Sequence, residues 1–500
     1  MALISTWFFV FLIASLIIYY ILPIKIRYVA LCLSSAVYMY FAGGILGTIV
    51  LASFVILGIL FAKIMQSQFF SGEARSGLKR LVYIISMLLP VAALLLFKYI
   101  NPFGIEAPMG IAFYLMTFMG FMTDAYQGAI REKISPVGAG LIIGFFPMMT
   151  SGPIVRYGEN ATNIKEGHKF CYINILHGIQ RILWGTFKKL IISERCAVIV
   201  NTVYAAPDTF SSAFLVFAIF AFVLQLYTDF SGCMDIVVGA AEMFGIKLPE
   251  NFDTPFFSRN VSEFWRRWHI TLGAWLKDYV MYPVLHSELF RKFKKACKNK
   301  IGKKHGEKPA LYLSMFISWT IIGYWHGGSL KYIFGVGWWF LAIIVLGELL
   351  SPFFGWIKRV LKIRTNNTSY HIFESLRTLM FVGVGLSFFR AASFSVGIDY
   401  WKCIFTNAQN QKGMLFSNDI YSLGLDLQDI LVLIVAFIIL LLVSIIQYKN
   451  AKKGTSVRGW LDQQNLVFRW TVYIILIFAV VIFGKYGQGY NAADFIYQGF

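Results

Sequence analysis

Charged residues are scarce in this chain. Only 14% of its 500 residues are Asp, Glu, Lys or Arg, whereas 58% are hydrophobic and 17% aromatic, a balance that excludes an ordinary soluble domain. Cysteine is also sparse: there are six, without a Cys-x-x-Cys pair. The sequence therefore predicts no disulfide framework, no metal site and no bound cofactor.

Acidic residues are fewer still, since 25 Asp and Glu face 45 Lys and Arg, for a net charge of +20. The basic residues lie in short segments between apolar runs, which is typical of cytoplasmic loops of a membrane protein and not of a nucleic-acid-binding surface. The densest segment, residues 291–308, holds nine basic side chains opposed by Glu307. We interpret it as a cytoplasmic anchor, with attraction to anionic lipid headgroups as the alternative.

Long apolar runs recur along almost the whole chain, from residues 4–22 to residues 470–483. We predict an all-α polytopic membrane protein, with about eleven membrane-spanning helices plus re-entrant and interfacial segments. Four spans are expected between residues 3 and 97. The first run lacks the basic start and the small-residue cleavage site of a secretory signal, so it is interpreted as a retained span that begins outside.

Glycine and proline break the apolar pattern between residues 102 and 153. Irregular backbone at membrane depth is tolerated where protein or a watery cavity covers it. The segment is expected to form re-entrant pieces that line an internal site, or else a pair of kinked structural helices. We divide the chain into N-terminal spans (1–100), a core (101–350) and C-terminal spans (351–500) of a single domain.

Two histidines stand in unusual surroundings, His269 in EFWRRWHITLGAW and His326 in IGYWHGGS. Neither belongs to a metal-ligand pair. At about 1.5 Å per helical residue, His326 lies roughly 22 Å along the apolar helix that starts at Leu311. An ionisable residue at that depth indicates function, because a neutral imidazole can take a proton from an attacking hydroxyl. The local sequence alone favours a buried histidine that is hydrogen-bonded to a neighbouring helix.

Further polar candidates lie near these histidines in the sequence. Residues 263–277 alternate tryptophans with cations, which suits an interfacial helix or a donor site in which Arg266 and Arg267 grip phosphates. Asp229 and Asp235 interrupt an apolar run and need partners or water. We expect structural pairing for the two aspartates, with a polar cavity as the alternative.

Four ordered segments resemble the membrane-bound O-acyltransferases, in particular the bacterial branch that modifies surface polysaccharides and teichoic acids. They are PMGIAFYLMTFMGFMTDAY, FFPMMTSGPIVRYGE, the block from LQLYTDFSGC to KDYVMYP, and GYWHGGS. The resemblance implies a tunnel through the membrane core, with His326 as the essential catalytic residue and His269 as a second site residue on the donor side. It also makes Trp325, Arg266, Arg267, Asp229 and Asp235 candidates for substrate or donor binding.

The same resemblance implies the reaction. An acyl group, acetyl from acetyl-CoA, would be moved across the bacterial cytoplasmic membrane to O-acetylate a polysaccharide, with an extracytoplasmic acyltransferase as partner. His326 would act as general base or as transient acyl carrier. The segments LRTLMFVGVGLSFFRAASF and FGKYGQGYNAADFIYQGF resemble acetylating members, whereas the basic stretch after DYVMYP resembles the D-alanylating ones.

Two other classes remain open on the residues alone. A transporter or flippase could use the aspartates and histidines as a proton or substrate path, and would move cargo without consuming a thioester. A structural scaffold for polymer export would tolerate replacement of the polar residues as long as their hydrogen bonds were kept.

Overall fold

The computed structural model describes residues 3–67, 76–101, 104–303, 305–407, 418–451 and 453–486. Over these residues the chain is helical, and the extended backbone makes one isolated bridge in place of a sheet. Seven described helices are long and apolar enough to span a bilayer: Ile24–Gln66, Ser76–Tyr99, Ser212–Met243, Leu330–Leu349, Thr368–Arg390, Leu427–Ala451 and Leu466–Phe483. The prediction of an all-α, multi-pass membrane protein is confirmed. The final sequence segment cited above for its resemblance lies mostly outside the described residues.

The first hundred residues contain the four apolar segments expected there. They are α1 (Thr6–Ile21), the two parts of α2 (Arg27–Gln66) and α3 (Ser76–Leu94), which the π-helical turn η4 (Leu95–Tyr99) extends. The division of α2 falls at Gly44, whose φ of 65° is open to glycine at little cost. The seven candidate spans among the described residues are fewer than the predicted total of about eleven. One reason is that helices such as α4 (Ile111–Gln127) have fewer than 18 residues.

The broken segment after residue 102 is interior to the protein. Helix α4 buries nearly all of its side chains, and α5 (Pro136–Gly144) packs against α2 and α6 (Tyr157–Lys165). Residues 145–155 are irregular and every one of them is buried. Protein therefore covers the irregular backbone, as its membrane depth requires.

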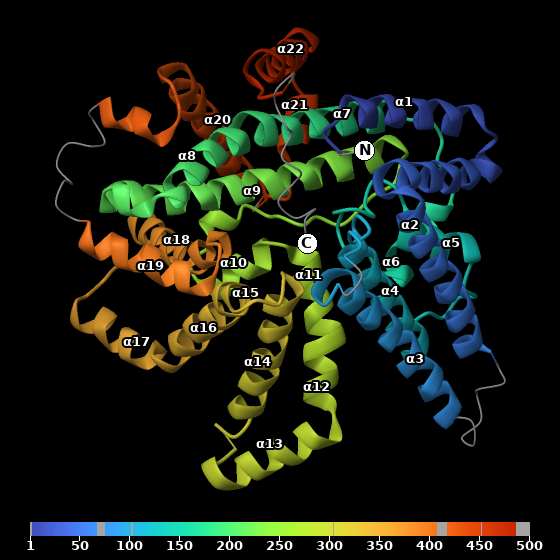
Figure 1. Cartoon of the computed structure of the whole chain (residues 1–500), viewed down its shortest axis with the longest axis horizontal. Helices are drawn as coiled ribbons and strands as arrows, with labels where there is room; N and C mark the ends of the chain where they lie inside the picture. Colours follow the sequence, from blue (N-terminus) through green and yellow to red (C-terminus); the bar gives the residue numbers. More distant parts are fainter. Residues whose placement is uncertain are drawn as a thin grey trace.

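Two long antiparallel helices cross the middle of the molecule (Figure 1). The first is continuous through α7 (Tyr172–Phe187), η5 (Lys188–Ser193) and α8 (Glu194–Ala205), and the second is α9 (Ser212–Met243). They touch at two glycine crossings, Gly178 against Gly239 and Gly185 against Gly232. Absence of side chains at these points brings the two backbones into direct contact.

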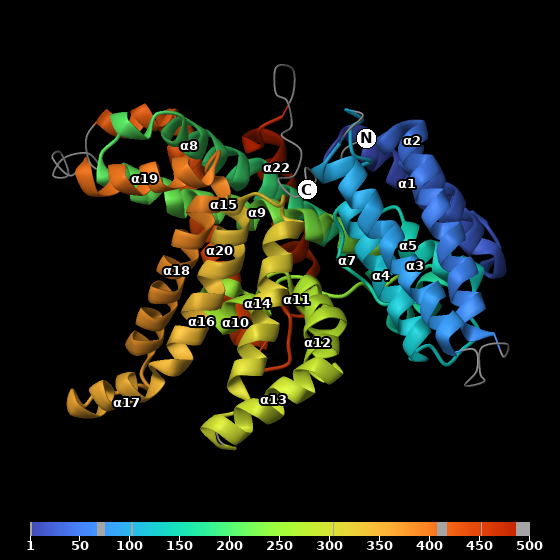
Figure 2. The same ribbon diagram turned by 60° about the horizontal axis from the view of Figure 1, so that its bottom comes forward.

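The N-terminal helices and a second group of helices lie toward opposite ends of the central pair (Figures 1 and 2). This second group holds α14 (Lys308–Trp325), α15 (Leu330–Tyr332), η9 (Ile333–Trp338), α16 (Trp339–Leu349), α18 (Thr368–Arg390) and α19 (Phe394–Thr406). The C-terminal α20 (Leu427–Ala451), α21 (Val457–Asp462) and α22 (Leu466–Phe483) pack on the α7 and η5 side of the pair.

Two amphipathic basic helices, α13 (Glu288–Ile301) and α17 (Ser351–Val360), lie at the same end of this group (Figure 2). An ion pair of 2.8 Å between Lys308 and Glu348 joins the start of α14, just after α13, to the end of α16, just before α17. Both helices expose large apolar side chains beside their cations. This pattern is typical of helices that lie in the membrane interface.

Candidate functional site

A short pairing of extended backbone positions the first histidine. The segment before α10 (Val261–Arg267) runs beside the residues between α10 and α11 (Ile270–Leu276), with a bridge between Phe252 and Trp268. On either side of this bridge, Asp253 N donates to Arg267 O and Ile270 N donates to Asn251 O, both at 3.0 Å.

His269 sits at the turn into α11 with φ of 49° and ψ of 51°, the left-handed region. A non-glycine residue there costs about 1–2 kcal/mol, so the surrounding structure has to hold it. The side chain is buried. Its Nδ1 lies 3.3 Å from Asn251 Oδ1, and its ring makes edge contacts with Phe230 and Trp325.

His326 terminates α14, and its backbone N–H donates to Ile322 O at 3.1 Å. Its buried ring packs edge-on against Trp325 at a centroid distance of 4.8 Å and against Phe389 of α18 at 5.4 Å. Gly327 and Gly328 follow with φ of 150° and 73°, and a Cβ on Gly327 would strike the Tyr332 ring at 2.5 Å. Glycine is required for this tight turn.

Trp325 brings the two histidines into one site. Its indole contacts both imidazoles, and Phe113 of α4 packs edge-on against it at 5.6 Å. Residues far apart in sequence therefore share one buried cluster. A small cavity between α4, α5 and residues 148–154 adjoins this cluster, since Phe113 is part of its lining.

Two side chains that the sequence did not single out fix the end of α14. Lys98 Nζ donates to Trp325 O and Tyr99 OH donates to Tyr324 O, both at 2.8 Å. A cation suits the negative end of a helix dipole. The only sequence signal was a Lys-Tyr pair at the end of an apolar run, which is too common to indicate a site.

The interfacial reading of residues 263–277 is wrong. Trp268 and Trp275 are buried, and Trp265 packs against Trp319 and Phe340. The segment lies inside the protein because α9, α14 and α16 cover its aromatic side chains. The alternation of tryptophans with cations had suggested that these side chains lie in the membrane interface.

The two arginines of this segment differ in their surroundings. Arg267 forms ion pairs of 3.1 Å with Asp253 and with Glu263, whereas Arg266 is exposed on α10. Their part in donor binding stays a prediction.

Asp229 is buried, and Asp235 is partly buried, in the interface between the two central helices. Lys189 Nζ lies 2.6 Å from Asp229 and 2.7 Å from Glu194. Lys188 Nζ lies 2.6 Å from Asp235, which also accepts a 2.9 Å bond from Arg181 Nε. These contacts supply the partners that carboxylates at membrane depth need.

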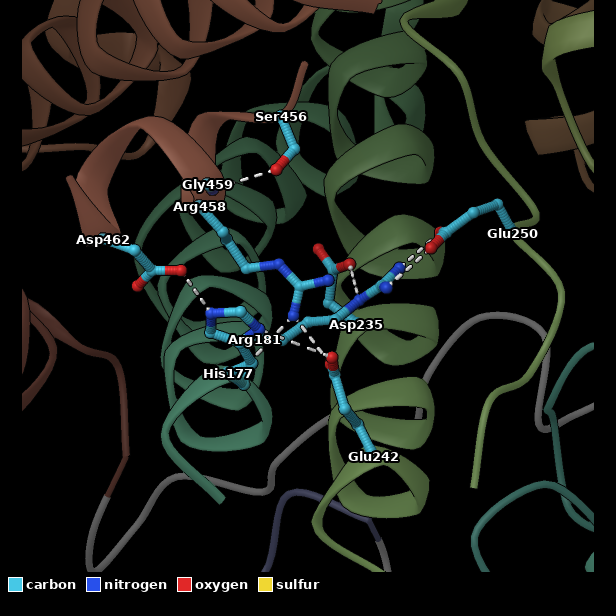
Figure 3. Close-up of polar contacts among 9 residues, drawn as sticks. All are labelled: His177, Arg181, Asp235, Glu242, Glu250, Ser456, Arg458, Gly459 and Asp462. Atoms are coloured by element: carbon cyan, nitrogen blue, oxygen red, sulfur yellow. Dashed lines mark hydrogen bonds and ion pairs between the residues drawn. The ribbon is translucent and has the colours of Figure 1, made fainter. Parts of the chain in front are cut away.

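Figure 3 shows the contact of Arg181 with Asp235 beside a second set of charged contacts that reaches the C-terminal helices. Arg181 joins Asp235 to Glu250, and two turns along α9 from Asp235, Glu242 accepts a 2.7 Å bond from Arg458 of α21. His177 Nε2 lies 2.7 Å from Asp462 at the end of α21. This second set therefore ties α21 to the central pair.

Replacement of Asp235 by Asn is expected to destabilise the protein by about 3 kcal/mol, because Lys188 and Arg181 lose their shared, partly buried carboxylate. The loss of stability is measured by thermal unfolding in detergent, with size-exclusion chromatography as the readout. The control is Asp399→Asn, which removes an exposed ion pair with Lys402 worth about 0–1 kcal/mol. Equal melting temperatures of the two variants would contradict the prediction.

No group of three His, Cys, Asp or Glu side chains with the geometry of a metal site occurs among the residues that the structure describes. The polar chemistry of the cluster rests on imidazole nitrogens, an asparagine amide and a lysine. Such a set can move protons and orient a carbonyl group.

Comparisons with known proteins point to one family. The family model "MBOAT, membrane-bound O-acyltransferase family" matches residues 143–297, a range that includes His269 and Asn251. The match ends before His326.

Relatives with assigned names cover more of the chain. A probable alginate O-acetylase of Pseudomonas syringae pv. tomato is 28% identical over 58% of this chain and 50% of its own length. A peptidoglycan O-acetyltransferase of Helicobacter pylori is 28% identical over 58% and 57%. A teichoic acid D-alanyltransferase of Bacillus subtilis is 27% identical over 52% and 66%. The chain thus spans about half the length of the first of these relatives.

Proposed function

We propose that this chain, whose residues 143–297 match the model of the membrane-bound O-acyltransferase family, is an acyltransferase that moves an acyl group across a bacterial cytoplasmic membrane. The donor is acetyl-CoA and the final acceptor is a hydroxyl of a cell-surface or secreted polysaccharide. Relatives named as an alginate O-acetylase and a peptidoglycan O-acetyltransferase support acetyl as the acyl group.

The observation that carries this proposal is the buried cluster of His269, Trp325 and His326. His326 acts as general base: it takes the proton of an acceptor hydroxyl as the oxygen attacks the thioester carbon. A C–O bond forms, the C–S bond breaks, and the thiolate of coenzyme A recovers the proton. Positioned proton transfer of this kind contributes roughly 10²- to 10⁴-fold in rate.

Burial of the cluster serves the same chemistry. A thioester exposed to bulk water would be lost to hydrolysis, and a closed site limits that side reaction. Phe113, Phe230 and Phe389 surround the two imidazoles and Trp325 with apolar surface. The donor reaches the cluster from the cytoplasmic side through the tunnel that the family resemblance implies, and the acceptor arrives from the opposite side.

The acyl group reaches the polysaccharide in two successive transfers. We propose an extracytoplasmic acyltransferase, anchored or secreted nearby, that receives the acyl group and passes it to the polysaccharide. The lipid bilayer is the other constant partner, since seven described helices are long and apolar enough to span it.

A second candidate donor is a D-alanyl thioester on a carrier protein, with teichoic acid as the acceptor. Two observations favour it. One is the similarity to the teichoic acid D-alanyltransferase of Bacillus subtilis, and the other is the basic helix α13, which lies in the stretch after DYVMYP that resembles the D-alanylating members. The chemistry at His326 is the same for both donors.

The test uses inverted membrane vesicles that contain the full chain and, where known from neighbouring genes, its partner. Acetyl-CoA that is radiolabelled in its acetyl group is added outside the vesicles. The label that reaches the lumen and the free coenzyme A that is released are measured separately. We expect label to leave the donor and accumulate inside. Accumulation only from a D-alanyl carrier protein would select the second donor. Movement of polysaccharide without thioester consumption would overturn the proposal in favour of a transporter.

A further inference from the structure

Asn251 gathers three hydrogen-bond donors on one atom. Its side-chain Oδ1 lies 3.0 Å from Thr271 N, 3.0 Å from Thr271 Oγ1 and 3.3 Å from His269 Nδ1. The residue is buried, with 2% of its surface exposed. We propose that Asn251 is a positioning residue that holds His269 in one tautomer, with the proton on Nδ1 and the lone pair on Nε2. This inference rests on the proposed function.

The identity of the accepting atom follows from the donors around it. A backbone N–H can only donate, so the atom of Asn251 that faces Thr271 N is the amide oxygen and not the amide nitrogen. The nitrogen faces the other way, with Nδ2 lying 3.2 Å from the sulfur of Met234. An amide oxygen has no proton to give, and His269 Nδ1 must therefore be the donor in their contact.

A fixed tautomer decides which nitrogen of His269 can accept a hydrogen bond. With Nδ1 engaged as a donor, Nε2 is the basic nitrogen of the neutral ring. This nitrogen can accept a hydrogen bond from an N–H group of the donor, while His326 takes the proton of the acceptor hydroxyl. Ring contacts with Phe230 and Trp325 limit rotation of the imidazole, so the amide selects the tautomer of a ring that packing already orients.

The backbone around His269 has its own supports. Ile270 N donates to the backbone oxygen of Asn251, and the Phe252–Trp268 bridge lies beside it. Thr271 Oγ1 accepts a 3.1 Å bond from Ile154 N, which joins the pairing to the buried irregular segment. Loss of the Asn251 side chain removes the two bonds from Thr271 but leaves these other bonds in place, and folding of each variant is checked by size-exclusion chromatography before its tautomer is measured.

Three variants separate positioning from structure. Asn251→Leu keeps the volume but removes the acceptor, and we expect kcat to fall roughly 10²-fold with the KM for the donor unchanged. Asn251→Asp keeps an acceptor at the same place, and we expect activity within a few-fold of wild type. The added negative charge favours the imidazolium, so the acidic limb of the pH–rate profile moves to higher pH.

The matched control is Thr271→Val, which removes hydrogen bonds from the same network but leaves the contact between Asn251 and His269. We expect it to lose only a few-fold in kcat, with an unchanged pH profile. If Thr271→Val and Asn251→Leu lose activity equally, and Asn251→Asp neither restores rate nor shifts the profile, the positioning role is overturned.

A readout independent of activity is solid-state NMR of the chain with ¹⁵N-labelled histidine rings, in which His269→Gln identifies the His269 signals. The expected signature is a protonated Nδ1 and an unprotonated Nε2, lost in Asn251→Leu. The opposite tautomer in wild type would overturn the inference. Failure of acyl transfer in wild type would instead count against the proposed function, because the NMR result stands without it.

Discussion

Replacement of His326 by glutamine is expected to abolish acyl transfer while the protein stays folded in the membrane. Glutamine keeps a polar side chain of similar size at the end of α14, but it cannot take a proton at working pH. Removal of a positioned general base costs roughly 10²- to 10⁴-fold in rate. The measurement is label release from acetyl-CoA in vesicles, normalised to the amount of protein that elutes as a single species in detergent.

The matched control is His286→Gln, at the end of α12 (Tyr282–His286), where the side chain is exposed. It changes the same residue type away from the buried cluster and is expected to keep wild-type activity. Full transfer by His326→Gln would exclude His326 both as a general base and as a transient acyl carrier. A hydroxylamine-sensitive label on the wild-type chain that is lost in this variant would identify the carrier role.

The largest expected effect on stability comes from Gly185→Leu. A Cβ at this position would lie 2.5 Å from the backbone oxygen of Gly232, and a Cβ on Gly232 would lie 2.8 Å from Gly185 O. Backbone atoms cannot turn aside as a side chain can, so α7 and α9 must separate. Overpacking typically costs 1–3 kcal/mol, and we expect about 3 kcal/mol or more here, seen as a lower melting temperature in detergent.

The control for this variant is Gly347→Leu in α16, where an added Cβ would meet nothing within 4 Å. The same substitution at an open position is expected to change the free energy of unfolding by at most about 0.5 kcal/mol. The melting temperature therefore stays close to that of the wild type. Equal melting of the two variants would show that the central helices are not held by their glycine crossings.

The sequence predicted the helical membrane architecture because long apolar runs have few alternatives in a bilayer. It also indicated that Asp229 and Asp235 need partners, since charges at membrane depth are costly. It did not identify Lys188 and Lys189 as those partners, because the choice depends on how α9 and the η5 turn face each other. A π-helical turn such as η5 changes the number of residues per turn. The ordinary helical spacing therefore does not show which side of the helix Lys188 and Lys189 face.

The candidate site was only partly predictable. His326 stood out because it ends an apolar helix beside two glycines and His269 because it follows tryptophans and arginines, and the family resemblance implied a role for each. Asn251 gave no signal, since its contact with His269 depends on a non-local pairing of extended backbone. Burial of Trp268 was missed for a related reason: alternation of aromatic and basic residues is equally compatible with an interface and with an interior covered by other helices.

The buried charge network between the central helices also constrains how the chain enters the membrane during synthesis. A charged residue at the centre of a lone helix costs about 2.5–3.5 kcal/mol on insertion, and the first central helix carries Lys188, Lys189, Glu194 and Arg195 close together. The counter-charges of Lys188 and Lys189 lie on α9, which is translated later. We therefore expect residues 172–243 to enter the bilayer together as a helical hairpin in which the two lysines are already paired.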